Sequence, residues 1–248
     1  MNTYRKNAVI AGVLYFLGTV FGILSNVIGG DVLSSLSLGK PLVGVDILSL
    51  VAANSSQITR GAFLILMMGI SLAAMTVFLY PIFRKDSEEL AGGLLLFRGA
   101  MEGTFYFLST LCFLAQVALG NTYSATGADS VVLQSMSNAL YQFQVRLAPV
   151  GPIFFLIGAM CLYVSFYRTR LIPRWLTVWG FIGVVFYMAS TLLKFFDMNA
   201  SGIGFYLEMV LAPQEMVMAV WLIVKGFNPS AMAALPEKTA TNELLSAA

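Results

Sequence analysis

The stretch LAGGLLLFRGAMEGTFYFLSTLCFLAQVAL, residues 90–119, is long and apolar enough to cross a membrane but contains two charged residues, Arg98 and Glu102. A transmembrane helix needs about 20 mostly apolar residues, and a charged side chain near the bilayer centre costs roughly 2.5–3.5 kcal/mol on insertion scales. Residues four apart share one helix face, and that face continues through Ser109 and Gln116. This pattern predicts a transmembrane helix whose polar stripe faces the interior of a helical bundle.

Five further stretches of the chain have the length and composition of membrane spans. Of the 248 residues, 58% are hydrophobic and 10% are charged, whereas soluble domains carry about 25% charged residues. We therefore predict an all-α polytopic transmembrane bundle of about six helices in residues 1–227, followed by a polar, disordered cytoplasmic tail in residues 228–248. The six predicted spans are residues 8–28, 61–82, 90–119, 139–167, 175–196 and 203–224.

Positively charged residues gather in alternate connections between the predicted spans. Because cytoplasmic loops of membrane proteins are enriched in Lys and Arg, this distribution predicts that both termini are cytoplasmic. The first outer connection, residues 29–60, contains an amphipathic segment at residues 43–53, for which we predict a short helix lying at the outer interface. The cations on the predicted cytoplasmic side are Arg5, Lys6, Arg84, Lys85, Arg168, Arg170, Arg174, Lys225 and Lys238.

The composition excludes several classes of site. The chain has no His and two Cys, so it lacks His-ligated haem, His-containing zinc sites and every Ser-His or Cys-His catalytic pair. Cys112 and Cys161 fall at opposite depths of the predicted bilayer, and we expect no disulfide between them. The net charge of +2 is too small to indicate binding to nucleic acid. We expect no cofactor and no metal.

Further ionisable and amide residues fall within or at the ends of the other spans. Glu208 and Glu215 are seven residues apart, which places them on one helix face, and Pro213 between them is expected to bend that helix. Gln142 and Arg146 share a face of the fourth span. Ionisable residues inside a membrane are functional candidates by default, so the candidate ligand site or intramembrane charge network consists of Arg60, Arg98, Glu102, Gln142, Arg146, Lys194, Glu208 and Glu215.

Three interpretations of these charges stay open. They are an ion-pair network that holds helices in register, a cavity open to the outer side that binds a polar group, and a proton or ion pathway through Glu102 and Glu215. Our principal hypothesis is a non-enzymatic membrane protein that binds, senses or transports a small polar or amphipathic ligand, with membrane lipid as its other partner. The alternatives are a structural or partner-binding protein and, without a nucleophile–base pair to support it, a lipid-modifying enzyme.

Three segments resemble those of a known family. They are RLIPRWLTVWG at residues 170–180, IFFLIGAM at residues 153–160 and EMVMAVWLIVKG at residues 215–226. In this order and spacing, and together with the helices that contain Arg60 and Arg98, they resemble the DUF4386 family of uncharacterised multipass bacterial membrane proteins. The resemblance covers most of the chain. It implies a protein of the prokaryotic inner membrane with about six helices, and it implies no activity.

Overall fold

The computed structural model describes residues 3–38, 46–126, 131–198 and 202–236. These residues form helices joined by turns, and no strand occurs among them. One of the helices, η1, is of the π type. In chain order the helices are α1 (Thr3–Leu38), α2 (Ile47–Ala53), α3 (Ser55–Phe83), α4 (Glu88–Leu94), η1 (Leu95–Met101), α5 (Glu102–Thr126), α6 (Val131–Leu147), α7 (Val150–Thr169), α8 (Arg174–Phe195), α9 (Ile203–Glu208), α10 (Ala212–Val224) and α11 (Pro229–Ala233).

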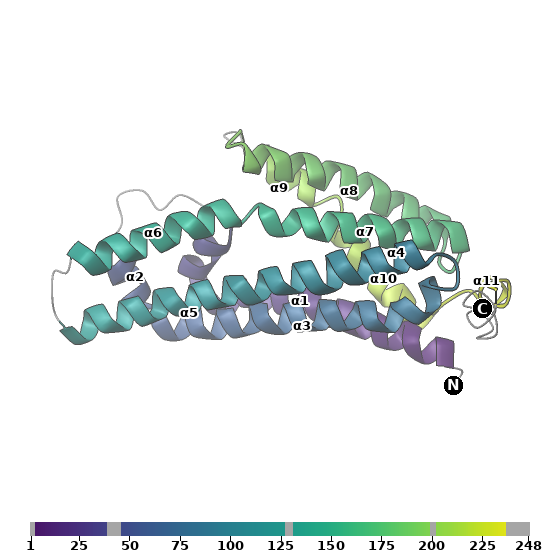
Figure 1. Ribbon diagram of the computed structural model, residues 1–248, viewed down its shortest axis with the longest axis horizontal. Helices are drawn as coiled ribbons and strands as arrows, with labels where there is room; N and C mark the ends of the chain where they lie inside the picture. The colour runs from purple at the N-terminus through teal and green to yellow at the C-terminus, as the bar shows by residue number, and fades with distance from the viewer. Residues whose placement is uncertain (1–2, 39–45, 127–130, 199–201, 237–248) are drawn as a thin grey trace, which may run out of the picture.

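Six candidate membrane spans are present in the described part of the chain, which confirms the predicted all-α bundle. α1, α3 and α8 each supply one span, and α4, η1 and α5 run on as a fourth. The pairs α6–α7 and α9–α10 supply the remaining two. The start of α1 lies at the same end of the elongated bundle as α11 (Figure 1). A chain that crosses a membrane an even number of times has both of its ends on the same side, as seen here.

Three of the six spans are interrupted. α1 has a kink at Gly30, whose backbone is not helical (φ 74°, ψ −177°). The other two interruptions fall where the sequence predicted continuous helices, in residues 139–167 and 203–224. α6 ends just before Pro149, and α7 begins just after it. A turn separates α9 from α10, which has Pro213 in its first helical turn. Proline has no N–H to donate to the preceding turn, and its ring clashes with that turn. Pro213 therefore stands at the start of a new helix, and the predicted bend is a complete break.

The hairpin of α7 and α8 matches the thickness of a bilayer. Its helices of 20 and 22 residues measure about 30 and 33 Å at 1.5 Å per residue, and the hydrocarbon core of a bilayer is about 30 Å thick. α6 continues beyond this hairpin, beside the far part of α5, and α2 lies in the same region (Figure 1). We call the part of the bundle built from α2, α6 and the C-terminal ends of α1 and α5 the distal layer.

The short helix predicted at residues 43–53 is present as α2. The carboxylate of Asp46 caps its first turn by accepting a hydrogen bond of 3.1 Å from the N–H of Leu48. Leu48 and Val51 are buried, and α2 packs mainly against α5 and α6. α2 is therefore a packed component of the distal layer; its position relative to a membrane interface stays a prediction, and residues 43–45 lie outside the described residues.

Two apolar clusters hold the bundle together. The larger one joins α1, α3, α7, α8 and α10 around residues such as Leu162 and Leu222, and the smaller one joins α2 to parts of α1, α3, α5 and α6 around Leu33. Met68 and Tyr106 pack against both clusters. Inside a bilayer, helices associate through close packing because lipid is as apolar as their side chains. A departure from close packing where the two clusters meet therefore indicates a role other than holding the helices together.

The predicted tail, residues 228–248, is helical at its start. Asn228 caps α11, since its side chain accepts a hydrogen bond of 3.1 Å from the N–H of Ser230. Residues 237–248 lie outside the described residues, so disorder of the tail remains a prediction for them.

Candidate functional site

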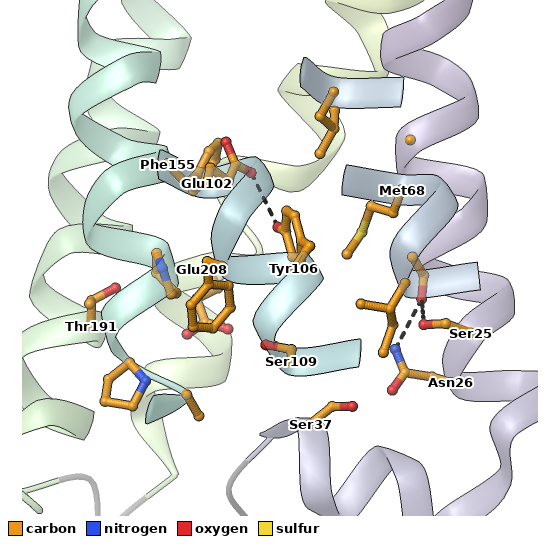
Figure 2. A pocket seen from close by; sticks show the side chains of 18 of the residues that line it. Ser25, Asn26, Ser37, Met68, Glu102, Tyr106, Ser109, Phe155, Thr191 and Glu208 are labelled. Carbon is orange, nitrogen blue, oxygen red and sulfur yellow. Dashed lines mark hydrogen bonds between the residues drawn. The ribbon is translucent and has the colours of Figure 1, made fainter. Parts of the chain in front are cut away.

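A cavity of about 750 Å³ lies between the two apolar clusters. Its wall is built by α1, α3, η1 and each helix from α5 to α10. Figure 2 shows Ser25 and Asn26 on one side of the cavity, Phe155 and Thr191 on the other, and Tyr106 of α5 between them. Pockets of about 300–1,000 Å³ accommodate drug-sized molecules. The cavity is therefore large enough for a small organic ligand.

Three charged side chains meet at the closed end of the cavity. The guanidinium of Arg98 lies 3.5 Å from Glu102, between Nη1 and Oε2, and 3.4 Å from Glu215, between Nη2 and Oε1. Only 2% of the side chain of Arg98, 2% of that of Glu102 and 15% of that of Glu215 is exposed. We call these three residues the charged triad. The four-residue spacing brings Arg98 to Glu102, and Glu215 joins them from α10.

Two tyrosines position the carboxylates of the triad. The hydroxyl of Tyr15 on α1 donates a hydrogen bond to Oε1 of Glu215, and the hydroxyl of Tyr106 on α5 donates one of 3.2 Å to Oε1 of Glu102. Hydrogen bonds to charged groups are roughly twice as strong as those between neutral groups. Each carboxylate is therefore fixed by one tyrosine and by the shared guanidinium.

Arg98 enters the bundle where the backbone departs from α-helical geometry. It lies within η1, and π-type turns are frequent at functional sites. Gly158 of α7 permits the close approach of η1, because a Cβ atom at this position would lie 2.7 Å from Cβ and 2.8 Å from N of Arg98. The guanidinium carbon lies 4.3 Å from the ring centre of Phe155 and 5.1 Å from that of Tyr15. Backbone geometry and cation–π contacts together fix its position.

Several buried polar atoms of the cavity wall have no hydrogen-bond partner in the described part of the protein. At the closed end they are Nε and Nη1 of Arg98 and Oε2 of Glu102, of which Nη1 and Oε2 make only the 3.5 Å ion-pair contact with each other. Toward the distal layer they are Oδ1 of Asn26, Oγ of Ser37 and Nε2 of Gln144. A buried polar atom without a partner costs about 1–3 kcal/mol. This cost falls on side chains that line both ends of the cavity.

Among the charged residues of the cavity wall, side-chain exposure increases toward the end of α8, where the cavity reaches the surface. Lys194 is 33% exposed and pairs with Glu208 of α9, which also accepts a hydrogen bond of 2.7 Å from Ser190. Asp197 lines the cavity, is 67% exposed and pairs with Arg146 at the end of α6. The mouth of the cavity therefore lies at the end of the hairpin where α7 begins and α8 ends, and it holds two ion pairs.

The structure divides the predicted site residues into two groups. Arg60, Gln142 and Arg146 are exposed and lie outside the cavity wall. Arg60 donates to the backbone carbonyl of Ser56 on its own helix, at 3.1 Å, and Arg146 reaches the mouth only through Asp197. The remaining predicted residues line the cavity, and they are Arg98, Glu102, Lys194, Glu208 and Glu215.

The inward face of α6 was not among the predicted site residues. Ser137 and Gln144 are buried on this face. Gln116 of α5 donates 3.0 Å to the carbonyl of Ser137 and accepts 2.8 Å from its hydroxyl. Gln116 also donates to Oε1 of Gln144, at 3.4 Å. The seven-residue spacing of Ser137 and Gln144 places them on one face, but Ser135 and Gln142 have the same spacing. The contacts with Gln116 turn Gln144 inward in place of Gln142.

The described residues offer no obvious metal site. No group of three His, Cys, Asp or Glu side chains among them is arranged to hold an ion, and the triad carboxylates contact Arg98 instead. Cys112 and Cys161 are both free thiols.

Comparison with known proteins identifies the family of this chain. The sequence profile of a domain of unknown function, DUF4386, matches residues 10–226. No curated protein and no solved structure gives a significant match. The matched range includes every helix that contributes to the charged triad and to the mouth of the cavity. This multipass membrane protein therefore belongs to the DUF4386 family.

Proposed function

We propose that the protein binds a small amphipathic molecule in its interior cavity and senses or transports it. In this proposal the protein lies in the inner membrane of a prokaryote with both termini in the cytoplasm, as the Arg and Lys residues of alternate loops favour. The mouth at Lys194 and Asp197 then opens toward the outer face, and the charged triad lies deeper in the membrane.

One observation carries the proposal: the charged triad borders a cavity instead of a filled interior. Ion pairs that only hold helices in register need their remaining polar atoms satisfied within the protein. Atoms of Arg98 and Glu102 at one end of the cavity and of Gln144 at the other have no hydrogen-bond partner among the described residues. Unsatisfied polar groups on residues that line both ends of the cavity favour a ligand site over a purely structural network.

The composition of the cavity wall favours an amphipathic ligand. Between the polar ends the wall is formed by apolar and aromatic side chains, including Ile65, Leu72, Phe105 and Phe113. Ligand sites of this kind combine a mainly apolar lining with a few polar groups that fix the orientation of the ligand. A molecule with an apolar body and a polar or charged group fits both parts of the wall.

Thermal unfolding of the purified protein in detergent tests the proposal with three probes of similar shape: tetraphenylphosphonium, triphenylphosphine oxide and tetraphenylborate, which are cationic, neutral and anionic. A ligand at 100 times its dissociation constant stabilises the folded state by about 2.7 kcal/mol. We expect at least one probe to raise the Tm by several degrees.

The matched variants are Ser109→Phe, which fills the cavity from α5, and Ser135→Phe, which adds the same bulk on the exposed face of α6. The Tm shift is expected to disappear in Ser109→Phe and to persist in Ser135→Phe, provided that each variant unfolds cooperatively without probe. If none of the three probes shifts the Tm of the unmodified protein, the proposal is wrong.

A further inference from the structure

The charges around the cavity do not cancel at its closed end. Lys194 pairs with Glu208, and Asp197 pairs with Arg146, so each acid at the mouth has its own cation. At the closed end one guanidinium, that of Arg98, faces two carboxylates. If both carboxylates are ionised, the triad carries one uncompensated negative charge.

The neighbouring groups do not compensate that charge. From α1, α5, α7 and α8 the titratable side chains nearest to the triad are Tyr15, Tyr106, Tyr163 and Tyr187, which carry no positive charge. The next acid, from α9, is Glu208. Among the described residues that line the cavity, the only other cation is Lys194, which is bound to that acid.

An uncompensated carboxylate in a membrane interior must be neutralised. The cost of an isolated buried charge is high enough that the group takes up a proton or acquires a counter-ion. Two occupants can therefore neutralise the triad: a proton on one carboxyl group, or a cation lying in the cavity beside it. Glu102, whose side chain is only 2% exposed, is one of the residues that line the cavity, and its Oε2 atom has no hydrogen-bond partner in the described structure.

The wall around the triad suits an organic cation. Tyr15, Phe105, Tyr106, Phe155 and Tyr187 all line the cavity. The faces of aromatic rings attract cations, with gains of about 2 kcal/mol or more where the cation is desolvated. The guanidinium of Arg98 already occupies such a position over Phe155 and Tyr15. No group of three His, Cys, Asp or Glu side chains among the described residues is arranged to hold a metal ion, whereas a lipophilic cation finds both charge and apolar contact in the cavity.

We infer that the ligand is a lipophilic organic cation and that its binding releases a proton from the pair Glu102 and Glu215. This inference rests on the proposed function and names its ligand class. In the free protein one of the two carboxyl groups carries a proton. When the cation enters, the O–H bond breaks, the proton leaves to water through the mouth, and the carboxylate and the cation form an ion pair. No other bond changes, and the net charge of the site is the same before and after exchange.

Isothermal titration of the purified protein with tetraphenylphosphonium, in two buffers of different ionisation enthalpy, measures the number of protons released. We expect about one proton per bound cation. As the pH falls below the range in which the pair loses its proton, the dissociation constant should rise about tenfold per pH unit.

Glu102→Gln and Glu215→Gln each remove the surplus carboxylate, so each should abolish proton release and weaken binding at least tenfold. Glu88→Gln, at an exposed ion pair on α4, is the matched control and should change neither.

The three probes separate this inference from the proposed function. Binding of tetraphenylborate or triphenylphosphine oxide without binding of tetraphenylphosphonium would overturn the inference and leave the proposed function intact. Absence of binding by all three probes would overturn both. Binding of tetraphenylphosphonium without proton release, or with full proton release in both Gln variants, would overturn the assignment to the triad. Measurement of the Tm of each variant keeps a loss of folding from being taken for a loss of binding.

Discussion

Arg98 and Glu215 are 117 residues apart in the chain, yet Nη2 of the arginine lies 3.4 Å from Oε1 of the glutamate. The contact joins the π helix η1 to α10, and Tyr15 of α1 donates to the same carboxylate oxygen. Three spans therefore meet at one atom, at the closed end of the cavity. The charged triad consequently links packing to the site, and substitutions there test both.

Replacement of Arg98 by Met should be strongly destabilising. The side chain is 2% exposed, and removal of one partner from a buried ion pair costs about 3–5 kcal/mol because the other charge is left uncompensated. The triple variant Arg98→Met, Glu102→Gln, Glu215→Gln removes the charges together and should recover much of this loss. Denaturant titration in detergent measures both. Equal stability of the single and triple variants would show that the charges are not coupled.

The ion pair at the mouth should behave differently from the triad. The side chains of Arg146 and Asp197 are each 67% exposed, and exposed ion pairs contribute about 0–1 kcal/mol. We expect Arg146→Gln to lower the free energy of unfolding by less than 1 kcal/mol, in the same assay in which Arg98→Met is measured. A loss for Arg146→Gln as large as that for Arg98→Met would mean that the mouth is as tightly packed as the closed end.

Gly158 should tolerate no side chain, because the atoms that a Cβ would meet belong largely to the backbone of η1. The Cβ would lie 2.8 Å from N and 3.1 Å from Cα of Arg98, and overpacking of this kind costs typically about 1–3 kcal/mol. Gly158→Ala is therefore expected to lower the Tm and to weaken probe binding. The matched control is Gly92→Ala on α4, where an added Cβ has no neighbour within 4 Å and Ala favours the helix by about 1 kcal/mol. A lower Tm for the control than for Gly158→Ala would contradict the packing argument.

The spans and the pair Arg98–Glu102 were predictable because both depend on local sequence. Hydropathy over about 20 residues identifies a span, and a four-residue spacing places two side chains on one face. The partner of that pair was not predictable in the same way. Glu208 and Glu215 were expected on one face of a continuous helix, but the break between α9 and α10 directs Glu208 to Lys194 and Glu215 to Arg98.

The prediction was wrong for a different reason at the residues that lie outside the cavity wall. Arg60 and Arg146 were grouped with the site by charge, by depth along their helices and, for Arg146, by the face that it shares with Gln142. None of these determines which face packs against a neighbouring helix. In α6 the inward face follows Ser137 and Gln144, because Gln116 of α5 bonds both side chains. That choice depends on contacts between helices, which a single sequence does not contain.

The distal layer gives a test of how the bundle lies in the membrane. If the α7–α8 hairpin matches the hydrocarbon core, α6 lies outside it, and the exposed Ser135 on α6 faces water on the outer side. In a background with both native cysteines replaced by Ser, Ser135→Cys should react with a membrane-impermeant maleimide added to intact cells. Val185→Cys, 64% exposed near the middle of α8, should not react, because a thiol surrounded by lipid does not ionise. Labelling of Ser135→Cys only after the cells are opened would show that the orientation is the reverse of the predicted one. No labelling of Ser135→Cys in either intact or opened cells would show that α6 lies within the bilayer.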